Sequence, residues 1–176
     1  MNKIVDIELY RTRSLEQRCF GAWEKRFKEK FTLSDRVGDI SDKTLYQLAC
    51  PGDDSNQAFY EIIMGSLDLG SAVTFGSLED DHKLRIIEIH LFLVDIIRFE
   101  LMRRLSWLTC FLICNERIVL LVQHAEKIKE RYCNQPLKLA ATHPEYESYR
   151  NLIPREKEAF IRGLLTSALD AFSRRV

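Results

Sequence analysis

Glycine and proline are both scarce in this sequence, with 7 glycines and 4 prolines among 176 residues. Neither residue occurs between Ser77 and Gln135. Because these two residues are the strongest breakers of regular structure, their scarcity excludes a proline-rich disordered chain and favours long helices. A chain of this length corresponds to one domain, so we expect residues 1–176 to form a single helical domain.

An excess of charge of either sign is also lacking, since 26 basic residues balance 26 acidic residues. A dedicated nucleic-acid binder carries a basic surface that neutralises phosphates. The balanced total and the acidic character of the segment 51–100 argue against that class. Nucleic acid is therefore not the partner that the composition favours.

Long apolar runs are missing as well. The longest uncharged run extends from Leu105 to Asn115, whereas a membrane-spanning helix needs about 20 apolar residues. Lys3, Asp6 and Glu8 interrupt the apolar stretch that a secretory signal would need. The 5 cysteines are an odd count and are typical of a reducing compartment. These features predict a soluble, cytoplasmic protein that does not contact a membrane.

Apolar residues recur every three to four positions through most of the chain, which predicts an all-α fold. We expect an up-and-down helical bundle of about five to seven helices. Its outer helices are predicted from capping serines and apolar stripes, with Ser14, Ser41 and Ser55 as caps. They are a first helix at 15–31, preceded by an extended or helical arm at 1–13, then helices at 42–50, 56–67 and 154–174.

A central hydrophobic helix pair is predicted at about 78–105 and 107–132. From Leu84 to Leu105 apolar residues occupy most of the circumference of the first helix, so its neighbours should surround it. In the second helix, a seam that begins at Trp107 and ends at Tyr132 is typical of a helix packed along another helix.

The two central helices must be separate, because one straight helix over both segments would be about 80 Å long. Ser106 to Thr109 is the favoured position of the break, and Asn115-Glu116 is the second choice, since both segments offer side chains that bond to backbone. A β-hairpin of residues 108–114 with 117–122 is an alternative for this region.

Metal and cofactor signals are weak. Glu79 and His82 have the spacing found in di-metal helical bundles, but a second such motif is absent. Cys110 and Cys114 lie one helical turn apart without the second pair that a structural zinc site needs. The sequence also lacks a glycine-rich phosphate loop. We therefore expect neither a metal nor a cofactor.

Arg117 and His124 are separated by six residues. This pair resembles the Arg-x(4 to 6)-His motif of HEPN-type ribonucleases, which are all-α bundles; Arg85 and His90 also have a matching spacing. On a continuous helix Arg117 and His124 would share one face, about two turns apart. The resemblance implies that the histidine moves a proton and the arginine stabilises a developing oxyanion. An HEPN-like ribonuclease that uses Arg117 and His124 is the first alternative function.

The segment Ser41-Asp42-Lys43-Thr44-Leu45-Tyr46 resembles the start of the recognition helix in tetracycline-repressor-like regulators. That resemblance implies a degenerate helix-turn-helix near residues 34–48 and a DNA-binding regulator, which is the second alternative function.

Neither resemblance extends beyond a short motif, and recognisable catalytic triads are absent. The interpretation that we favour is a non-catalytic interaction or regulatory module rather than an enzyme. Its partner would be another protein or a second copy of the chain, bound through apolar helix faces that the fold leaves over.

Overall fold

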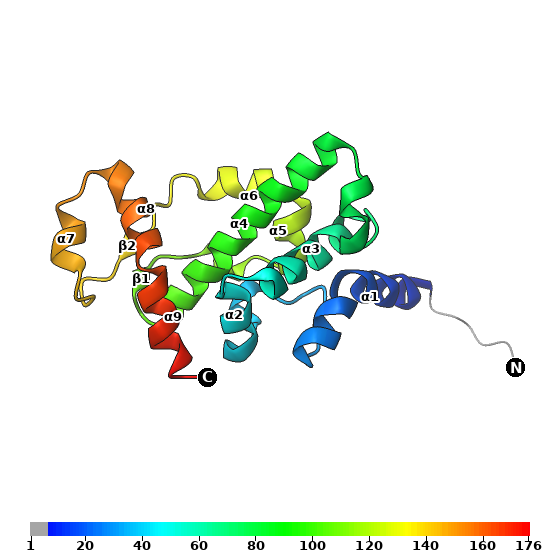
Figure 1. The fold of residues 1–176 in the computed structure, drawn as a ribbon, viewed down its shortest axis with the longest axis horizontal. Coiled ribbons are helices and arrows are strands. Elements are labelled where there is room, and N and C mark those ends of the chain that lie inside the picture. The colour runs from blue at the N-terminus through cyan, green and yellow to red at the C-terminus, as the bar shows by residue number, and fades with distance from the viewer. Residues whose placement is uncertain (1–6) are drawn as a thin grey trace, which may run out of the picture.

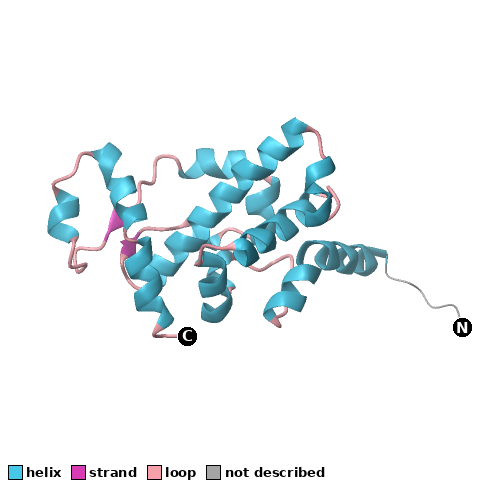
Figure 2. Cartoon of the chain, in the orientation of Figure 1, coloured by secondary structure: helices cyan, strands magenta, loops and turns pink. Residues whose placement is uncertain are grey.

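Helices account for 70% of the computed structural model, which describes residues 7–176 and confirms the all-α class (Figure 2). The α-helices in these residues are α1 (Ile7–Phe27), α2 (Asp42–Ala49), α3 (Asp53–Leu67), α4 (Asp80–Arg104), α5 (Ile118–Gln123), α6 (Ala125–Tyr132), α7 (Tyr146–Arg150), α8 (Pro154–Gly163) and α9 (Leu165–Ser173). The short elements between them are the 3-10 helices η1 (Val37–Asp39), η2 (Ala72–Ser77) and η3 (Ile113–Asn115) and the strands β1 (Leu108–Thr109) and β2 (Lys138–Leu139).

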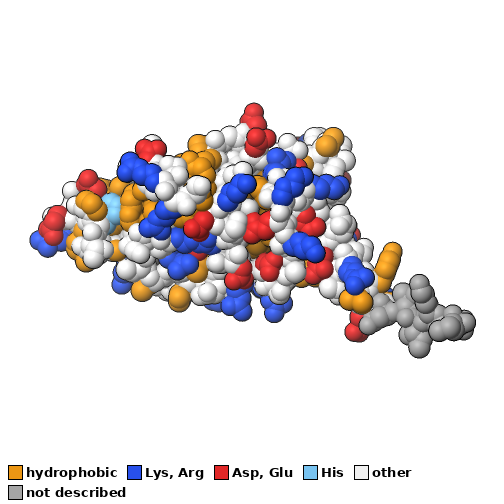
Figure 3. Space-filling model, turned by 90° about the horizontal axis from the view of Figure 1, so that it is seen from below, with side chains coloured by type: hydrophobic (Ala, Val, Ile, Leu, Met, Phe, Trp, Pro, Cys, Tyr) orange, Lys and Arg blue, Asp and Glu red, His pale blue; other side chains and the backbone are white. Residues whose placement is uncertain are grey.

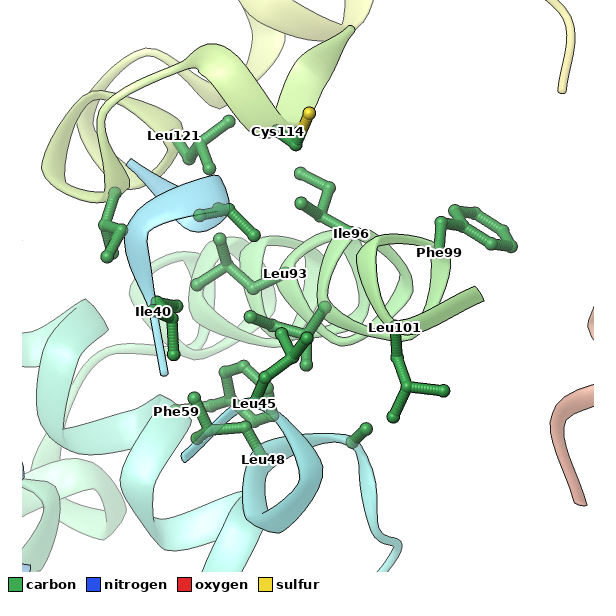
Figure 4. Close-up of a cluster of buried hydrophobic side chains, with 14 of the residues drawn as sticks. Ile40, Leu45, Leu48, Phe59, Leu93, Ile96, Phe99, Leu101, Cys114 and Leu121 are labelled. Atoms are coloured by element: carbon green, nitrogen blue, oxygen red, sulfur yellow. The ribbon is translucent and has the colours of Figure 1, made fainter. Parts of the chain in front are cut away.

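Helix α4 is the centre of the molecule, as predicted for the segment 78–105. It crosses the ribbon diagonally in Figure 1 and contacts α2, α3, α5 and α9. Figure 4 shows side chains from these neighbours converging on it, among them Leu45 of α2, Phe59 of α3 and Leu121 of α5. These residues belong to one hydrophobic cluster that extends from α1 to α9.

Helices α1 and α3 pack closely because small and aromatic residues face each other. The indole Nε1 of Trp23 donates a 2.7 Å hydrogen bond to the carbonyl oxygen of Ala58. Gly65 of α3 lies so close to α1 that a Cβ atom there would be 2.2 Å from the carbonyl oxygen of Arg18. Since α1 begins at Ile7, the described part of the arm 1–13 is helical, and Ser14 lies inside the helix rather than at its cap. Residues 1–6 are outside the described part of the chain.

The predicted helix at 107–132 is wrong in its first half, because α4 ends in a Schellman motif and the chain forms no α-helix again until Ile118. Ser106 adopts a left-handed conformation, with φ 62°. Its amide donates to the carbonyl of Arg103, and the next amide, from Trp107, donates to the carbonyl of Met102. The break therefore lies in the favoured segment Ser106 to Thr109, although glycine more often occupies the left-handed position that serine occupies here.

The alternative for this region, a β-hairpin of residues 108–114 with 117–122, is not formed. Strand β1 instead pairs antiparallel with β2, with Leu108 opposite Leu139. Residue 117 forms an isolated bridge with Arg36, and the amide of Ile118 donates to the carbonyl of Asp35. The α-helices within 107–132 are α5 and α6, and they are separated at His124, whose ψ of 30° departs from helical geometry.

The structure has more helices than the five to seven expected, because two expected helices are divided and α7 is additional. The expected helix 154–174 is divided into α8 and α9 at Leu164, next to Gly163, a weak helix former. Ser41 caps α2 as predicted, since its hydroxyl accepts a 3.2 Å hydrogen bond from the Thr44 amide. Ser55 does not cap α3; the cap is Gly52, and the Ser55 hydroxyl donates to the carbonyl of Cys50.

A buried ion cluster joins the C-terminal end of α4 to η1 and α2. The carboxylate of Glu100 is fully buried and accepts hydrogen bonds from the guanidinium groups of Arg103, at 2.6 Å, and Arg104, at 2.8 Å. Arg104 also binds the carboxylate of Asp42 at 2.6 Å and donates to the carbonyl of Gly38 at 3.1 Å. The side chain of Arg104 therefore connects three separate elements of the core.

Candidate interaction surface

Helix α4 exposes an apolar face over its N-terminal half. Leu84 and Leu91 are each 59% exposed, Ile87 is 39% exposed, and Val94 is half-buried. These residues follow each other at alternating spacings of three and four, which places them on one face of the helix. We call these four residues the α4 stripe.

The α4 stripe is exposed because the elements that cover this face reach only the other half of the helix. The same face continues through Leu101, which is fully buried, and Leu105, which is 9% exposed. Helices α2 and α9 pack against α4. The guanidinium of Arg175, after the end of α9, donates to the carbonyl oxygen of Arg104, at the C-terminal end of α4. The expectation that neighbours surround the whole helix is therefore wrong for the N-terminal half.

Opposite charges stand at the two ends of the stripe. At the N-terminal end, Asp80 is 98% exposed and forms a 3.2 Å ion pair with Lys83. At the C-terminal end, Arg98 is half-buried, and its Nε atom has no hydrogen-bond partner among the described residues. Burial lowers the pKa of the Arg98 guanidinium, and the nearby Asp95 carboxylate acts in the opposite direction.

One flank of the stripe is acidic and partly neutralised. The carboxylate of Asp95 forms an ion pair with Arg162 of α8, and Arg162 also binds Glu158 at 2.6 Å. The guanidinium of Arg162 lies over the ring of Phe99, 5.3 Å from its centroid. Glu88, on the same flank, is exposed and forms no ion pair with any residue in the range 7–176. The fold therefore stabilises Asp95 but leaves Glu88 facing solvent.

The other flank holds His90 between aromatic rings of α3. Its ring centroid is 5.5 Å from that of Phe59 and 5.1 Å from that of Tyr60. Burial lowers the pKa of His90, and the nearby charge of Arg98 lowers it further. This side of α4 is already occupied by α3, so the stripe is the part of the N-terminal half that remains open.

A second apolar concavity lies between α4, the loop before α5, and α8. It has a volume of about 310 Å³, and its wall includes Phe99, Phe111 and Leu137, with Cys110 and Cys133 also on its lining. Seen from below in Figure 3, acidic and basic side chains are mixed over the middle of the molecule, and hydrophobic side chains gather towards the end that carries α7 and α8. The ion pairs of Arg162 occupy the polar part of this concavity, and no separate charged group in it selects a ligand.

The structure places Arg117 and His124 at the two ends of α5, as its N-cap and C-cap residues. Both residues are exposed. His124 lines a cavity of about 280 Å³ together with Arg85 and Glu88 of α4 and Lys127 of α6, and Arg117 is not part of that lining. The continuous helix on which both side chains would share one face is interrupted at His124 itself.

The segment 34–48 contains η1 and α2, and the helix before α2 has only three residues. Thr44, Leu45 and Leu48 of α2 are buried, and Asp42 binds Arg104. A recognition helix needs a preceding positioning helix and a free basic face, and this segment provides neither for a DNA groove.

Glu79 is the N-cap residue of α4, and His82 lies exposed in its first turn. Within residues 7–176, no three histidine, cysteine or acidic side chains gather as a metal site would require. The five cysteines of this range are all free. The described helices also include none that is long and apolar enough to cross a membrane.

Comparison with known proteins finds no matching family model, no matching curated protein and no matching solved structure. The candidate surface therefore rests on the geometry described above. Sequence reasoning missed the α4 stripe because an apolar pattern shows which faces of a helix are hydrophobic. It does not show whether other segments of the chain pack against those faces.

Proposed function

We propose that this protein is a non-catalytic interaction module and that it binds its partner through the α4 stripe. The observation that carries the proposal is the exposure of Leu84 and Leu91, each 59%, on a helix that is otherwise central to the core. Covering apolar surface stabilises a complex by roughly 25 cal/mol per Å². The stripe is thus a favourable place for a partner to bind, before the entropic cost of association is subtracted.

The chemistry of the stripe specifies the kind of partner. Apolar side chains at alternating spacings of three and four form a straight seam, and the complementary surface for such a seam is another helix with the same spacing. The partner is therefore a protein that offers an apolar helix face. Free cysteines are typical of a reducing compartment, and we extend the proposal to a cytoplasmic location.

The ribonuclease alternative receives no support from the positions of Arg117 and His124, which cap opposite ends of α5. Incubation of the protein with labelled RNA tests it directly. We expect no cleavage above that of a blank at any protein concentration. Cleavage by the wild type that is lost in His124→Ala would establish the ribonuclease and contradict our proposal.

The interaction surface is tested by placing a photo-crosslinking amino acid at single positions and irradiating the protein in an extract of its native cells. We expect one adduct of the same mass from positions 84 and 91, which share the stripe. Position 85, on another face of α4, and position 153, which is 58% exposed in front of α8, serve as controls and should give no such adduct. Equal labelling at all four positions, or none at positions 84 and 91, would contradict the proposal.

A further inference from the structure

We propose that the α4 stripe binds the α4 stripe of a second copy of this chain, with the two helices antiparallel. This inference rests on the proposed function, which it deepens by naming the partner. It follows from three features of the helix: the symmetry of the stripe, the charges at its ends, and the charges along its flanks.

The stripe is self-complementary in the antiparallel direction. A two-fold axis through the level of Ile89 places Ile87 opposite Leu91 of the second copy, and Leu84 opposite its Val94, because the residues of each pair are equally distant from Ile89. A two-fold interface requires this reciprocity, in which each residue meets its partner twice. Every apolar residue of the stripe then faces an apolar residue.

The same axis joins the opposite charges at the ends. Asp80 and Arg98 are equally distant from Ile89, so Asp80 of each copy meets Arg98 of the other. Asp80 pairs with Lys83 at 3.2 Å but is 98% exposed, so its carboxylate can also contact a second cation. Arg98 gains a carboxylate for a guanidinium whose Nε has no hydrogen-bond partner in residues 7–176. In a parallel pair, by contrast, Asp80 would face Asp80 and Arg98 would face Arg98 at the ends of the seam.

The charges along the flanks, taken alone, favour the parallel direction. In an antiparallel pair Glu88 faces Glu88 of the second copy, which is unfavourable, whereas in a parallel pair it would face Lys83, which is favourable. We commit to the antiparallel pair because its two Asp80–Arg98 contacts lie in line with the seam, where apolar residues exclude water and strengthen an ion pair. Glu88 lies at the solvent-exposed edge, where the repulsion between the two copies is weaker. Removing the charge of Glu88 therefore shows whether the two helices are parallel or antiparallel.

The seam between Asp80 and Arg98 is about 27 Å long at about 1.5 Å per residue. A single helix pair of this length buries less surface than the roughly 1,200 Å² at which stable interfaces begin. We therefore expect a reversible dimer whose population rises with protein concentration.

Sedimentation velocity over a series of protein concentrations tests the end charges. Asp80→Arg, a change at a fully accessible position, should weaken dimerisation by about tenfold, and Arg98→Asp should do the same, because each variant creates like charges at both ends. The double variant should regain the wild-type dissociation constant within about threefold, since the reversed pairs are again opposite in charge. A parallel dimer predicts no change in Asp80→Arg. Circular dichroism of each variant confirms that it is folded.

The Glu88→Gln variant tests the direction independently, with Glu147→Gln on the exposed surface of α7 as the matched control. The antiparallel pair predicts tighter dimerisation for Glu88→Gln and no change for the control. Weaker dimerisation would overturn the antiparallel arrangement. A wild type that stays monomeric at every concentration would overturn self-association altogether. The proposed function would still hold if crosslinks from positions 84 and 91 both lead to one other protein.

Discussion

Single residues with buried charge make the largest predictable contributions to the stability of this protein. Glu100 is fully buried between Arg103 and Arg104, so its removal takes away the carboxylate that Arg103 binds at 2.6 Å and leaves Arg104 with Asp42. Arg104 is itself only 14% exposed. We predict that Glu100→Ala lowers the free energy of unfolding by about 3 kcal/mol, measured by urea denaturation.

The matched control is Glu147→Ala, which removes an exposed carboxylate that pairs with Arg150 at 2.9 Å. Solvent screens this pair, so the expected loss is below about 0.5 kcal/mol. Equal losses in the two variants would show that the buried cluster does not stabilise the junction of α4, η1 and α2.

The half-buried His90 and the buried His143 predict how stability depends on pH. Burial lowers the pKa of His90 and of His143 below the ordinary value of 6.5, and Arg98 lowers that of His90 further. The ring of His143 lies edge-on to Trp107, 4.5 Å between centroids. The unfolded chain binds these protons at higher pH than the folded chain does, so the stabilisation is complete above the unfolded pKa and is lost on acidification.

We therefore predict that the free energy of unfolding falls from about pH 8 to about pH 5.5, in a range where few carboxylates titrate. His90→Phe and His143→Phe each remove one titrating group and should make the dependence shallower. An unchanged dependence in both variants, measured by urea denaturation at each pH, would contradict the assignment.

At the scale of elements, the close approach of α1 and α3 depends on the missing side chain of Gly65. Alanine would normally stabilise a helix interior, but here its Cβ would meet the carbonyl oxygen of Arg18 at 2.2 Å. We predict that Gly65→Ala lowers the free energy of unfolding by about 2 kcal/mol.

Gly163 provides the comparison, since a Cβ there meets no atom within 4 Å. Gly163→Ala should stabilise the protein by about 0.5 kcal/mol, because alanine restricts the unfolded chain. If both alanines changed stability in the same direction, the packing of α1 on α3 would not be as tight as described.

The region after α4 shows how far sequence patterns predict an element. Phe111, Cys114, Leu121 and Ile128 are buried, as the predicted seam requires. The first two nevertheless lie outside α-helix, because Ser106 ends α4 and a loop can bury its apolar residues as well as a helix can. Periodicity therefore predicted burial correctly here and predicted the helix incorrectly.

The α4 stripe shows what the sequence pattern does not predict, namely which part of a helix other segments cover. The sequence identified α4 as a helix with apolar residues around its circumference, and the structure confirms that helix within two residues at its start and one at its end. Which half stays open depends on where α9 and α2 lie, a property of packing between distant segments. The apolar pattern of α4 carries no information on that position, so Leu84 and Leu91 were expected in the core.

At the scale of the whole molecule, the fold has one central helix, α4, that residues 7–176 cover only in part. The covered half of that helix holds the Glu100 cluster and the contacts with α9, and the open half holds the α4 stripe. A second helix that packs along the open half would cover the exposed apolar residues of the α4 stripe. Self-association is therefore the property through which the whole account is tested.

The most direct measurement is sedimentation equilibrium of the wild type beside Leu91→Asp and Ile153→Asp, which alter side chains that are 59% and 58% exposed. The mass of the wild type and of Ile153→Asp should rise from 20.7 kDa towards twice that value as concentration increases. Leu91→Asp should remain at the monomer mass, with its unfolding free energy changed by less than about 0.5 kcal/mol. The same concentration dependence in all three proteins would contradict the role of the α4 stripe.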